Sequence, residues 1–157
     1  MKLYGIIEED LINYKKVSMT LQCPYCTFKC NKEYGKKICH NSDLQKSKLR
    51  EFDIENLIQR YLKNDLSEAI VFQGLEPFDS FDDIVKFIAD FREVCNDDIV
   101  IYTGYNEDEV QFELDCLSCY QNIIVKFGRF IPYSKQIFDE VLGVKLASSN
   151  QYAKKIS

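Results

Sequence analysis

Short apolar runs of strand type alternate along this chain with stretches whose apolar residues recur at helical intervals. The strand-type runs are residues 3–7, 17–21, 69–72, 99–102 and 123–127. Helical spacing predicts three helices, and each follows a residue type that commonly caps a helix N-terminus: Asp53, Ser80 and Asn106. Strands and helices in this order predict successive crossover units, and therefore an α/β fold with a mostly parallel sheet.

Capping signals refine the starts of the second and third helices. Ser80 and Asp83 have the spacing of a capping box, with Asp in place of the usual Glu, and Asn106 is followed three residues later by Glu109. We therefore expect the second helix to begin after Ser80 and the third to begin after Asn106.

The loops that follow three of the strands carry unusual residues. Right-handed crossovers place the carboxyl ends of parallel strands at one edge of the sheet, which is where open α/β sheets bind ligands. That edge would collect the cysteine-rich loop after residue 21, the loop at 73–77 and the loop at 103–105. The sequence therefore predicts a binding site at this rim.

Length and composition exclude several classes of protein. The 157 residues contain no repeat or linker, so we expect one domain spanning 1–157. Acidic residues at 8–10 interrupt the apolar N-terminal stretch, so we expect no signal peptide. No stretch reaches the roughly 18 apolar residues that a membrane span needs. Seven cysteines, an odd number, argue against a secreted disulfide framework, so we expect the reducing cytoplasm.

Charge is distributed unevenly along the chain. Residues 1–50 have a net charge of +5, residues 51–120 of −14 and residues 121–157 of +4. Either the charged residues form solvated faces, or the basic N-terminal loop faces an anionic ligand or partner. Because no continuous basic stripe with interleaved aromatics is present, we expect no nucleic-acid partner, and we expect no membrane partner.

Four cysteines lie within seventeen residues: Cys23, Cys26, Cys30 and Cys39. Four thiolates could close a tetrahedral zinc site, although only Cys23 and Cys26 have the common pair spacing. Alternatively, three thiolates could hold an iron–sulfur cluster and leave one iron open to substrate. The other three cysteines have weaker interpretations. Cys95 is predicted to lie in the core. Cys116 and Cys119 are either buried or idle cysteines, or they form a redox pair or a second metal site.

The spacing Cys26-Thr-Phe-Lys-Cys30 and the tripeptide Cys39-His40-Asn41 resemble the cluster motif of the radical S-adenosylmethionine superfamily. The resemblance is greatest to the activating proteins of anaerobic ribonucleoside-triphosphate reductase. Those proteins usually have two residues between the second and third cysteines, and this chain has eight, interpreted as an excursion over 31–38 that turns at Gly35. The resemblance implies Cys26, Cys30 and Cys39 as cluster ligands, with Cys23 as the alternative ligand.

Four further segments match the family in order: Gly74-Leu75-Glu76-Pro77, residues 102–105, residues 126–130 and the Ser-Ser-Asn-Gln run at 148–151. The run at 148–151 favours a reductase activator over a generic radical enzyme. By resemblance, eight residues would contact S-adenosylmethionine. They are Phe28, Ile38, Asn41, Gln73, Gly74, Glu76, Tyr102 and Thr103. Ile38 stands where the family often has an aromatic residue that contacts adenine.

The resemblance implies a truncated partial (β/α) barrel, a single radical S-adenosylmethionine domain with its cluster loop at 22–43. It implies a [4Fe-4S] cluster and S-adenosylmethionine as cofactors. Reductive cleavage would give a 5′-deoxyadenosyl radical that generates a glycyl radical on the reductase partner. The electron would come from a donor such as flavodoxin or ferredoxin. No catalytic residue beyond the cluster is predicted, and His40 is interpreted as a loop residue beside a ligand.

Two alternatives remain open. The same chemistry could act on another protein, a peptide or a small molecule, because the excursion before Cys39 departs from the family spacing. The chain could instead be a zinc-stabilised binding module that is not an enzyme and uses all four clustered cysteines.

Overall fold

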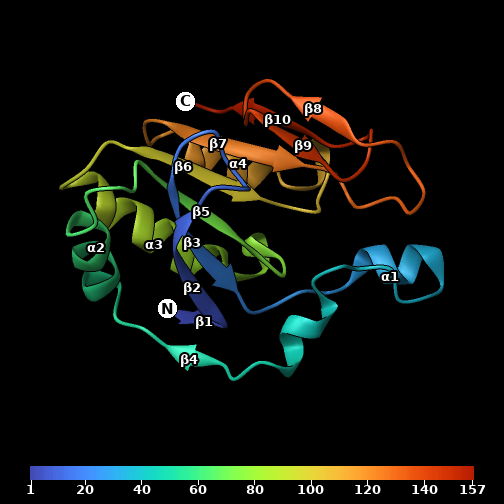
Figure 1. Ribbon diagram of the computed structural model, residues 1–157, viewed down its shortest axis with the longest axis horizontal. Coiled ribbons are helices and arrows are strands. Elements are labelled where there is room, and N and C mark those ends of the chain that lie inside the picture. The colour runs from blue at the N-terminus through green and yellow to red at the C-terminus, as the bar shows by residue number, and fades with distance from the viewer.

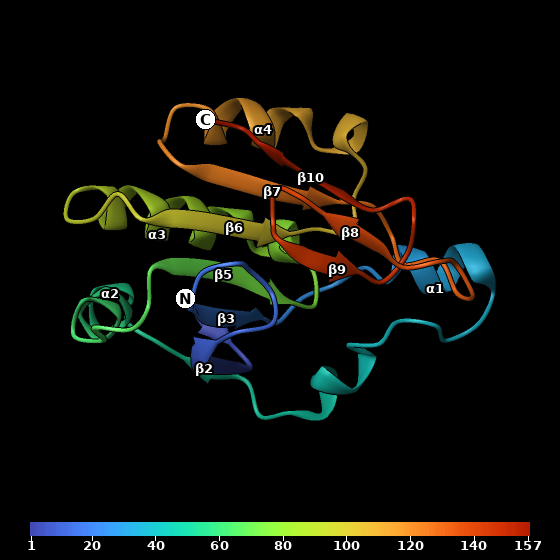
Figure 2. The same ribbon diagram turned by 45° about the horizontal axis from the view of Figure 1, so that its top comes forward.

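The computed structural model describes residues 1–157 and is built around one six-stranded sheet with helices on one of its faces (Figures 1 and 2). The helices are α1 (Lys29–Tyr34), α2 (Ile54–Leu62), α3 (Phe81–Arg92) and α4 (Gln111–Leu117). The strands are β1 (Lys2–Leu3), β2 (Gly5–Asp10), β3 (Ser18–Cys23), β4 (Arg50–Glu51), β5 (Ala69–Gly74), β6 (Asp98–Tyr102), β7 (Ile123–Phe127), β8 (Ile137–Asp139), β9 (Val144–Leu146) and β10 (Tyr152–Lys155).

The central sheet has the strand order β10-β7-β6-β5-β3-β2. Its four inner strands β3, β5, β6 and β7 are parallel, while β2 and β10 pair antiparallel at the two edges. The prediction of a mixed α/β fold with a largely parallel sheet is therefore confirmed. The loops that follow the four parallel strands all leave from the same edge of the sheet.

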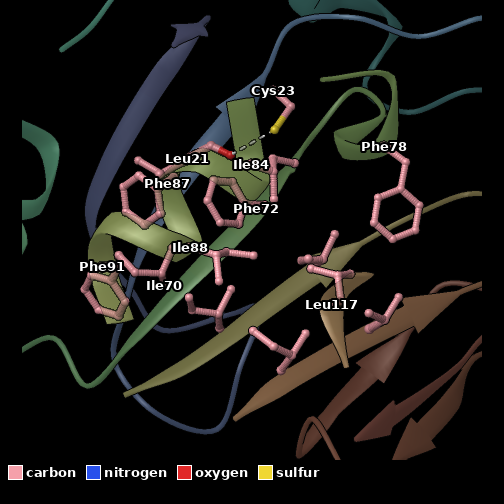
Figure 3. Packing of buried hydrophobic residues seen from close by; sticks show 14 of the residues in the cluster. Leu21, Cys23, Ile70, Phe72, Phe78, Ile84, Phe87, Ile88, Phe91 and Leu117 are labelled. Atoms are coloured by element: carbon pink, nitrogen blue, oxygen red, sulfur yellow. Dashed lines mark hydrogen bonds between the residues drawn. The ribbon is translucent and has the colours of Figure 1, made fainter. Parts of the chain in front are cut away.

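The helices α2, α3 and α4 pack their apolar sides on one face of this sheet. Leu57 of α2, Phe87 of α3 and Leu117 of α4 are buried in the same cluster as Ile70 and Ile101 of the sheet. Figure 3 shows how α3 residues of this cluster meet the side chains of β5. The helical spacing read from the sequence therefore marks most of the buried side of α2 and α3. In α4 the pattern is less faithful, because Phe112 is exposed. None of these helices is long and apolar enough to cross a membrane.

The opposite face of the sheet is covered without helices. Tyr14, from the β2–β3 loop, and Leu142 and Leu146, from the β8–β9 region, are buried against Val71 and Val100. The β8–β9 hairpin lies over this face in Figure 2. The sheet is open, with β2 and β10 as its edges, and the partial barrel stays a prediction.

Several predicted boundaries are confirmed and others are wrong. Asp53 caps α2 by accepting a hydrogen bond from the backbone N–H of Asn56. The helix α3 begins at Phe81, directly after Ser80, as predicted. The expected capping bond of Ser80 is absent, because the chain enters α3 through a 3₁₀ turn (Pro77–Ser80) capped by Glu76, and the Ser80 hydroxyl is buried without a partner. The capping box at Asn106 forms, but it caps a 3₁₀ turn (Glu107–Glu109) ahead of α4. The expected strand at 3–7 is divided between β1 and β2.

Two phenylalanines test whether the helix-bearing face supplies the core. Phe87 is 0% exposed and Phe112 is 73% exposed. We expect Phe87→Ala to lower the free energy of unfolding by about 3–5 kcal/mol, because it leaves a cavity, and Phe112→Ala to change it by less than about 0.5 kcal/mol. Urea unfolding of the two variants measures both values. Equal losses would contradict the described core.

Candidate functional site

A cavity of about 370 Å³ opens at the carboxyl edge of the four parallel strands. Its walls come from the loops after β3, β5, β6 and β7, from the ends of β5, β6 and β7, from Ile12 and Asn13 of the β2–β3 loop, and from residues 144–147 and Gln151. The thiol-bearing residues Cys26, Cys30 and Cys39 line it. Six of the eight residues predicted to contact S-adenosylmethionine also line it: Asn41, Gln73, Gly74, Glu76, Tyr102 and Thr103. Phe28 lines a separate shallow pocket, and Ile38 is not part of the cavity wall.

Cys23 has a different environment from the other three cysteines of the loop. It is 0% exposed, ends β3 and belongs to the apolar core under the helices. Its Sγ lies 4.0 Å from the carbonyl oxygen of Leu21. Figure 3 marks this contact with a dashed line. Burial is the main cause that raises the pKa of this thiol above its usual value. Cys26, Cys30 and Cys39 are partly exposed.

The eight residues between Cys30 and Cys39 fold into α1 and a tight return. Gly35 ends α1 with φ of +63°, a left-handed conformation that glycine adopts readily, so the predicted turn at Gly35 is confirmed. The Asn31 side-chain oxygen accepts hydrogen bonds from the backbone N–H of Ile38 (2.8 Å) and of Cys39 (3.0 Å). These two hydrogen bonds, here called the Asn31 bracket, hold the end of the excursion against α1. They place Cys39 beside Cys30.

The thiols of Cys30 and Cys39 are neighbours. The pKa of Cys30 is raised, first by burial and then by the adjacent Cys39 thiol. Burial likewise raises the pKa of Cys26 to about 12, although the backbone N–H of Phe28 donates to its sulfur at 3.2 Å and opposes the shift. Bound iron would reverse this balance, because a coordinating thiol is deprotonated outright.

The donor set suits an iron–sulfur cluster better than a single ion. No three His, Cys, Asp or Glu side chains converge closely enough to hold one metal ion. Thiolates that share one tetrahedral zinc at about 2.3 Å lie about 3.8 Å apart. A four-iron cluster binds each thiolate through a different iron and so needs wider spacing. Three partly exposed thiols on one cavity wall supply the three thiolates that such a cluster would need when one iron stays open.

Glu76 joins the loop after β5 to the loop after β6. Its carboxylate, 6% exposed, accepts hydrogen bonds from the hydroxyl of Thr103 (2.7 Å) and from the backbone N–H groups of Gly104 (2.8 Å) and Phe78 (3.1 Å). Burial raises the pKa of Glu76 to about 7, against the effect of these three donors. Glu76 therefore links the two loops through buried hydrogen bonds and also lines the cavity.

Lys126 is a buried cation in the cavity wall that we did not single out as a site residue from the sequence. Its ammonium donates to the carbonyl oxygens of Gly128 (2.9 Å) and Thr103 (3.4 Å). Burial lowers the pKa of Lys126 to about 8, and the Glu76 carboxylate acts in the opposite direction. A lysine inside the otherwise apolar strand Ile-Ile-Val-Lys-Phe is the signal that could have identified it.

The cysteine loop is tied to its neighbours at three points. The Asn41 amide donates to the carbonyl oxygen of Gly74 at 2.6 Å. The backbone N–H of Thr27 donates to the carboxylate of Asp79 at 2.8 Å. Arg129, beyond β7, pairs with Glu33 of α1 (3.2 Å) and with Glu109 (2.6 Å). The thiols are therefore held against the strand ends from several sides.

The Ser-Ser-Asn-Gln run at 148–151 clamps the loop after β7. Gln151 donates to the carbonyl oxygen of Gly128 (3.1 Å), and Asn150 donates to that of Arg129 (2.8 Å). The Ser148 hydroxyl accepts from the backbone N–H of Ile131 at 3.3 Å. The run at 148–151, which resembles the activator family in sequence, thus holds the loop after β7 in place beside Lys126.

The remaining candidates lie outside this arrangement or at its margin. The ring of His40, an exposed residue on the cavity wall, lies 4.1 Å from that of Phe130 between centroids. Cys95 is half-buried beside the core, near its predicted location. Cys116 is half-buried on α4, and the exposed Cys119 follows the end of that helix. The structure does not bring these last two to the cavity.

The buried Glu76 carboxyl predicts a specific pH dependence of stability. The folded protein keeps a proton on Glu76 up to about pH 7, whereas the unfolded chain releases it near its ordinary value of 4.5. Stability therefore falls as the pH rises from 4.5 to 7, and Glu76→Gln should flatten this slope by about 3 kcal/mol over the interval.

Urea unfolding of the metal-free protein and of Glu76→Gln at several pH values measures this difference. The variant loses stability at every pH because its amide group faces the Gly104 N–H, so the comparison concerns the slope alone. Parallel profiles for the two proteins would contradict the raised pKa.

Comparison with known proteins identifies the family. Residues 15–153, nearly the whole chain, match the family model described as a 4Fe-4S single cluster domain. No curated protein and no solved structure matches the chain. The matched segment includes every clustered cysteine and all of the cavity wall except Ile12 and Asn13. The chain therefore belongs to the family of 4Fe-4S single cluster domains and is an iron–sulfur protein.

Proposed function

We propose that this protein is a radical S-adenosylmethionine enzyme whose [4Fe-4S] cluster is bound by Cys26, Cys30 and Cys39. The observation that carries the proposal is that these three thiols line one cavity, while Cys23 is buried in the core. Three thiolates leave one of the four irons without a protein ligand, which is the arrangement that allows an iron to bind substrate. Membership in the single-cluster family supports the cofactor.

When bound, the cluster supplies one electron that breaks the bond from sulfur to C5′ of S-adenosylmethionine, giving methionine and a 5′-deoxyadenosyl radical. The chain's own residues bind and orient this cofactor. Carbonyl groups beside Gly74 and the Glu76 carboxylate suit its cationic amino group. The buried ammonium of Lys126 provides positive charge on the same cavity wall for its carboxylate. The cavity volume of about 370 Å³ falls within the range of small-molecule sites.

The proposed substrate is a glycine of an anaerobic ribonucleotide reductase. The order of the matching segments along the chain supports this, and above all the Ser-Ser-Asn-Gln sequence at 148–151, which resembles the activator family. A second candidate is the same chemistry on another protein, a peptide or a small molecule. The observation that favours it is α1, an added helix between Cys30 and Cys39 beside the cavity. We propose an external one-electron donor and a cytoplasmic location in either case.

Anaerobic reconstitution tests the proposed chemistry. Protein treated with iron and sulfide should turn brown and bind about four irons per chain, as one [4Fe-4S] cluster requires. Dithionite and S-adenosylmethionine should then release 5′-deoxyadenosine, quantified by chromatography. A colourless protein that holds one zinc ion would overturn the proposal in favour of the binding module.

Two cysteine variants carried through the same experiment identify the ligands. Cys39→Ala should lose most of its iron and all 5′-deoxyadenosine formation, because one thiolate of the proposed set is removed. Cys23→Ala should retain both, since its thiol lies in the core. The reverse pattern would make Cys23 the third ligand.

Asn31 provides a test of the loop geometry. Asn31→Ala removes the acceptor for two backbone N–H groups, which costs about 1–3 kcal/mol where they stay buried. We expect the variant to release iron to a chelator several-fold faster than the wild type, because Cys39 is no longer bracketed to α1. Asn31→Asp keeps an acceptor oxygen and should restore much of the retention.

The matched control is Asn56→Ala, which changes an exposed asparagine of α2. Its iron release should equal that of the wild type. If Asn31→Ala and Asn56→Ala release iron at the same rate, the bracket does not position Cys39.

A further inference from the structure

The positive charge of this protein is concentrated around its thiols. Residues 29–50, here called the basic loop, carry seven Lys or Arg and two Asp or Glu, a net charge of +5. The rest of the chain has a net charge of −10. The molecule is therefore strongly polarised, with its positive end at the segment that carries Cys30 and Cys39.

Much of this charge is unpaired and exposed. Lys37 and Lys46 share the single carboxylate of Asp43, at 3.0 and 2.9 Å. Four other basic residues of the loop are exposed and form no ion pair: Lys32, Lys36, Lys48 and Arg50. The helix α1 buries none of its residues and projects from the body of the sheet (Figure 1). The loop thus presents free positive charge to solvent.

The placement of this charge matters for electron supply. Cys30 lies on α1 between Lys29 and Lys32, and Cys39 follows Lys37 by two residues. Electron transfer between proteins weakens steeply with distance, so a donor must dock close to the cluster ligands. In the proposed function the cavity side is occupied by S-adenosylmethionine and the substrate. Exposed lysines of the basic loop stand two residues from both of its cysteines, Lys32 from Cys30 and Lys37 from Cys39, so a carrier that binds this loop lies beside two of the proposed ligands.

We propose that the basic loop is the docking surface for an acidic protein that carries single electrons; this inference rests on the proposed function. The carrier is oxidised by one electron, and that electron reduces [4Fe-4S]²⁺ to [4Fe-4S]⁺, so the step needs no other reactant. Opposite charges attract the carrier to the loop, and the negative remainder of the chain repels it elsewhere. The charge distribution therefore orients the encounter.

The features of the loop favour a protein over other polyanions. Apart from His40, Tyr34 is the one aromatic residue of the loop, so it offers few surfaces on which bases could stack. The sequence of α1, Lys-Cys-Asn-Lys-Glu-Tyr, has no apolar face that could enter a lipid surface. Nucleic acid and membrane are accordingly the competing outcomes of the test.

The first measurement is binding of an oxidised flavodoxin, by calorimetry at low and high salt. The double variant Lys32→Glu/Lys36→Glu should weaken binding at least about tenfold at low salt, and the difference should shrink as salt screens the charges. The control Lys63→Glu/Lys155→Glu changes the net charge equally at exposed lysines outside the loop and should bind like the wild type. Equal affinities for the two double variants would overturn the docking surface. So would no flavodoxin binding by the wild type, or tighter binding of a single-stranded RNA or of anionic vesicles.

The second measurement separates docking from chemistry. Dithionite reduces the cluster without docking, so the Lys32→Glu/Lys36→Glu protein should form 5′-deoxyadenosine with dithionite as the wild type does. With reduced flavodoxin its rate should fall about tenfold or more at low salt. Equal flavodoxin-driven rates in both proteins would overturn the docking surface and leave the proposed function intact. No product from wild type with dithionite would instead overturn the proposed function itself.

Discussion

The parallel pairing of β3 with β5 is the constraint on which the site depends. The strands stay in register to their last residues, so that Cys23 lies opposite Gly74. The two segments stay paired beyond the strand ends. The backbone N–H of Leu75 donates to the carbonyl oxygen of Cys23 at 3.0 Å, and that of Glu76 donates to the carbonyl oxygen of Tyr25 at 2.7 Å. Gly74 has φ of +103°, and a Cβ there would lie 2.9 Å from the backbone nitrogen of Cys23. Glycine permits this approach, which brings the thiol loop to the cavity.

Buried polar groups complete the cavity at the expense of stability. A carboxylate and an ammonium, those of Glu76 and Lys126, are almost fully removed from water. Hydrogen bonds from neighbouring loops offset much of the desolvation penalty. N–H and O–H groups donate to the Glu76 carboxylate, and a backbone carbonyl accepts from the Lys126 ammonium. The apolar core beneath α2, α3 and α4 supplies the stability that tolerates such a site. Fold and site are thus coupled, because the loops at the ends of the core strands carry the groups that hydrogen-bond to Glu76 and Lys126.

Local sequence signals identified most of the scaffold because they act through neighbouring residues. Asp53 capped α2 as predicted, and the loops predicted to share a rim do so. Ser80 failed as a cap because Glu76 and Pro77 start the turn earlier, and this depends on contacts of Glu76 with the distant loop at 103–104. The bracket made by Asn31 and the burial of Lys126 were not predicted, since each depends on where the chain returns. The hairpin β8–β9 and edge strand β10 have short, weakly apolar sequences that carry little signal.

The central claim is that three thiolates leave one iron open to S-adenosylmethionine. Electron paramagnetic resonance of the dithionite-reduced, reconstituted protein measures this directly, because binding at an iron changes the g-values of the reduced cluster. The account predicts a [4Fe-4S]⁺ signal that shifts when S-adenosylmethionine is added, before any turnover. A cluster signal that S-adenosylmethionine leaves unchanged would contradict the account and would indicate a fully ligated, electron-transfer cluster.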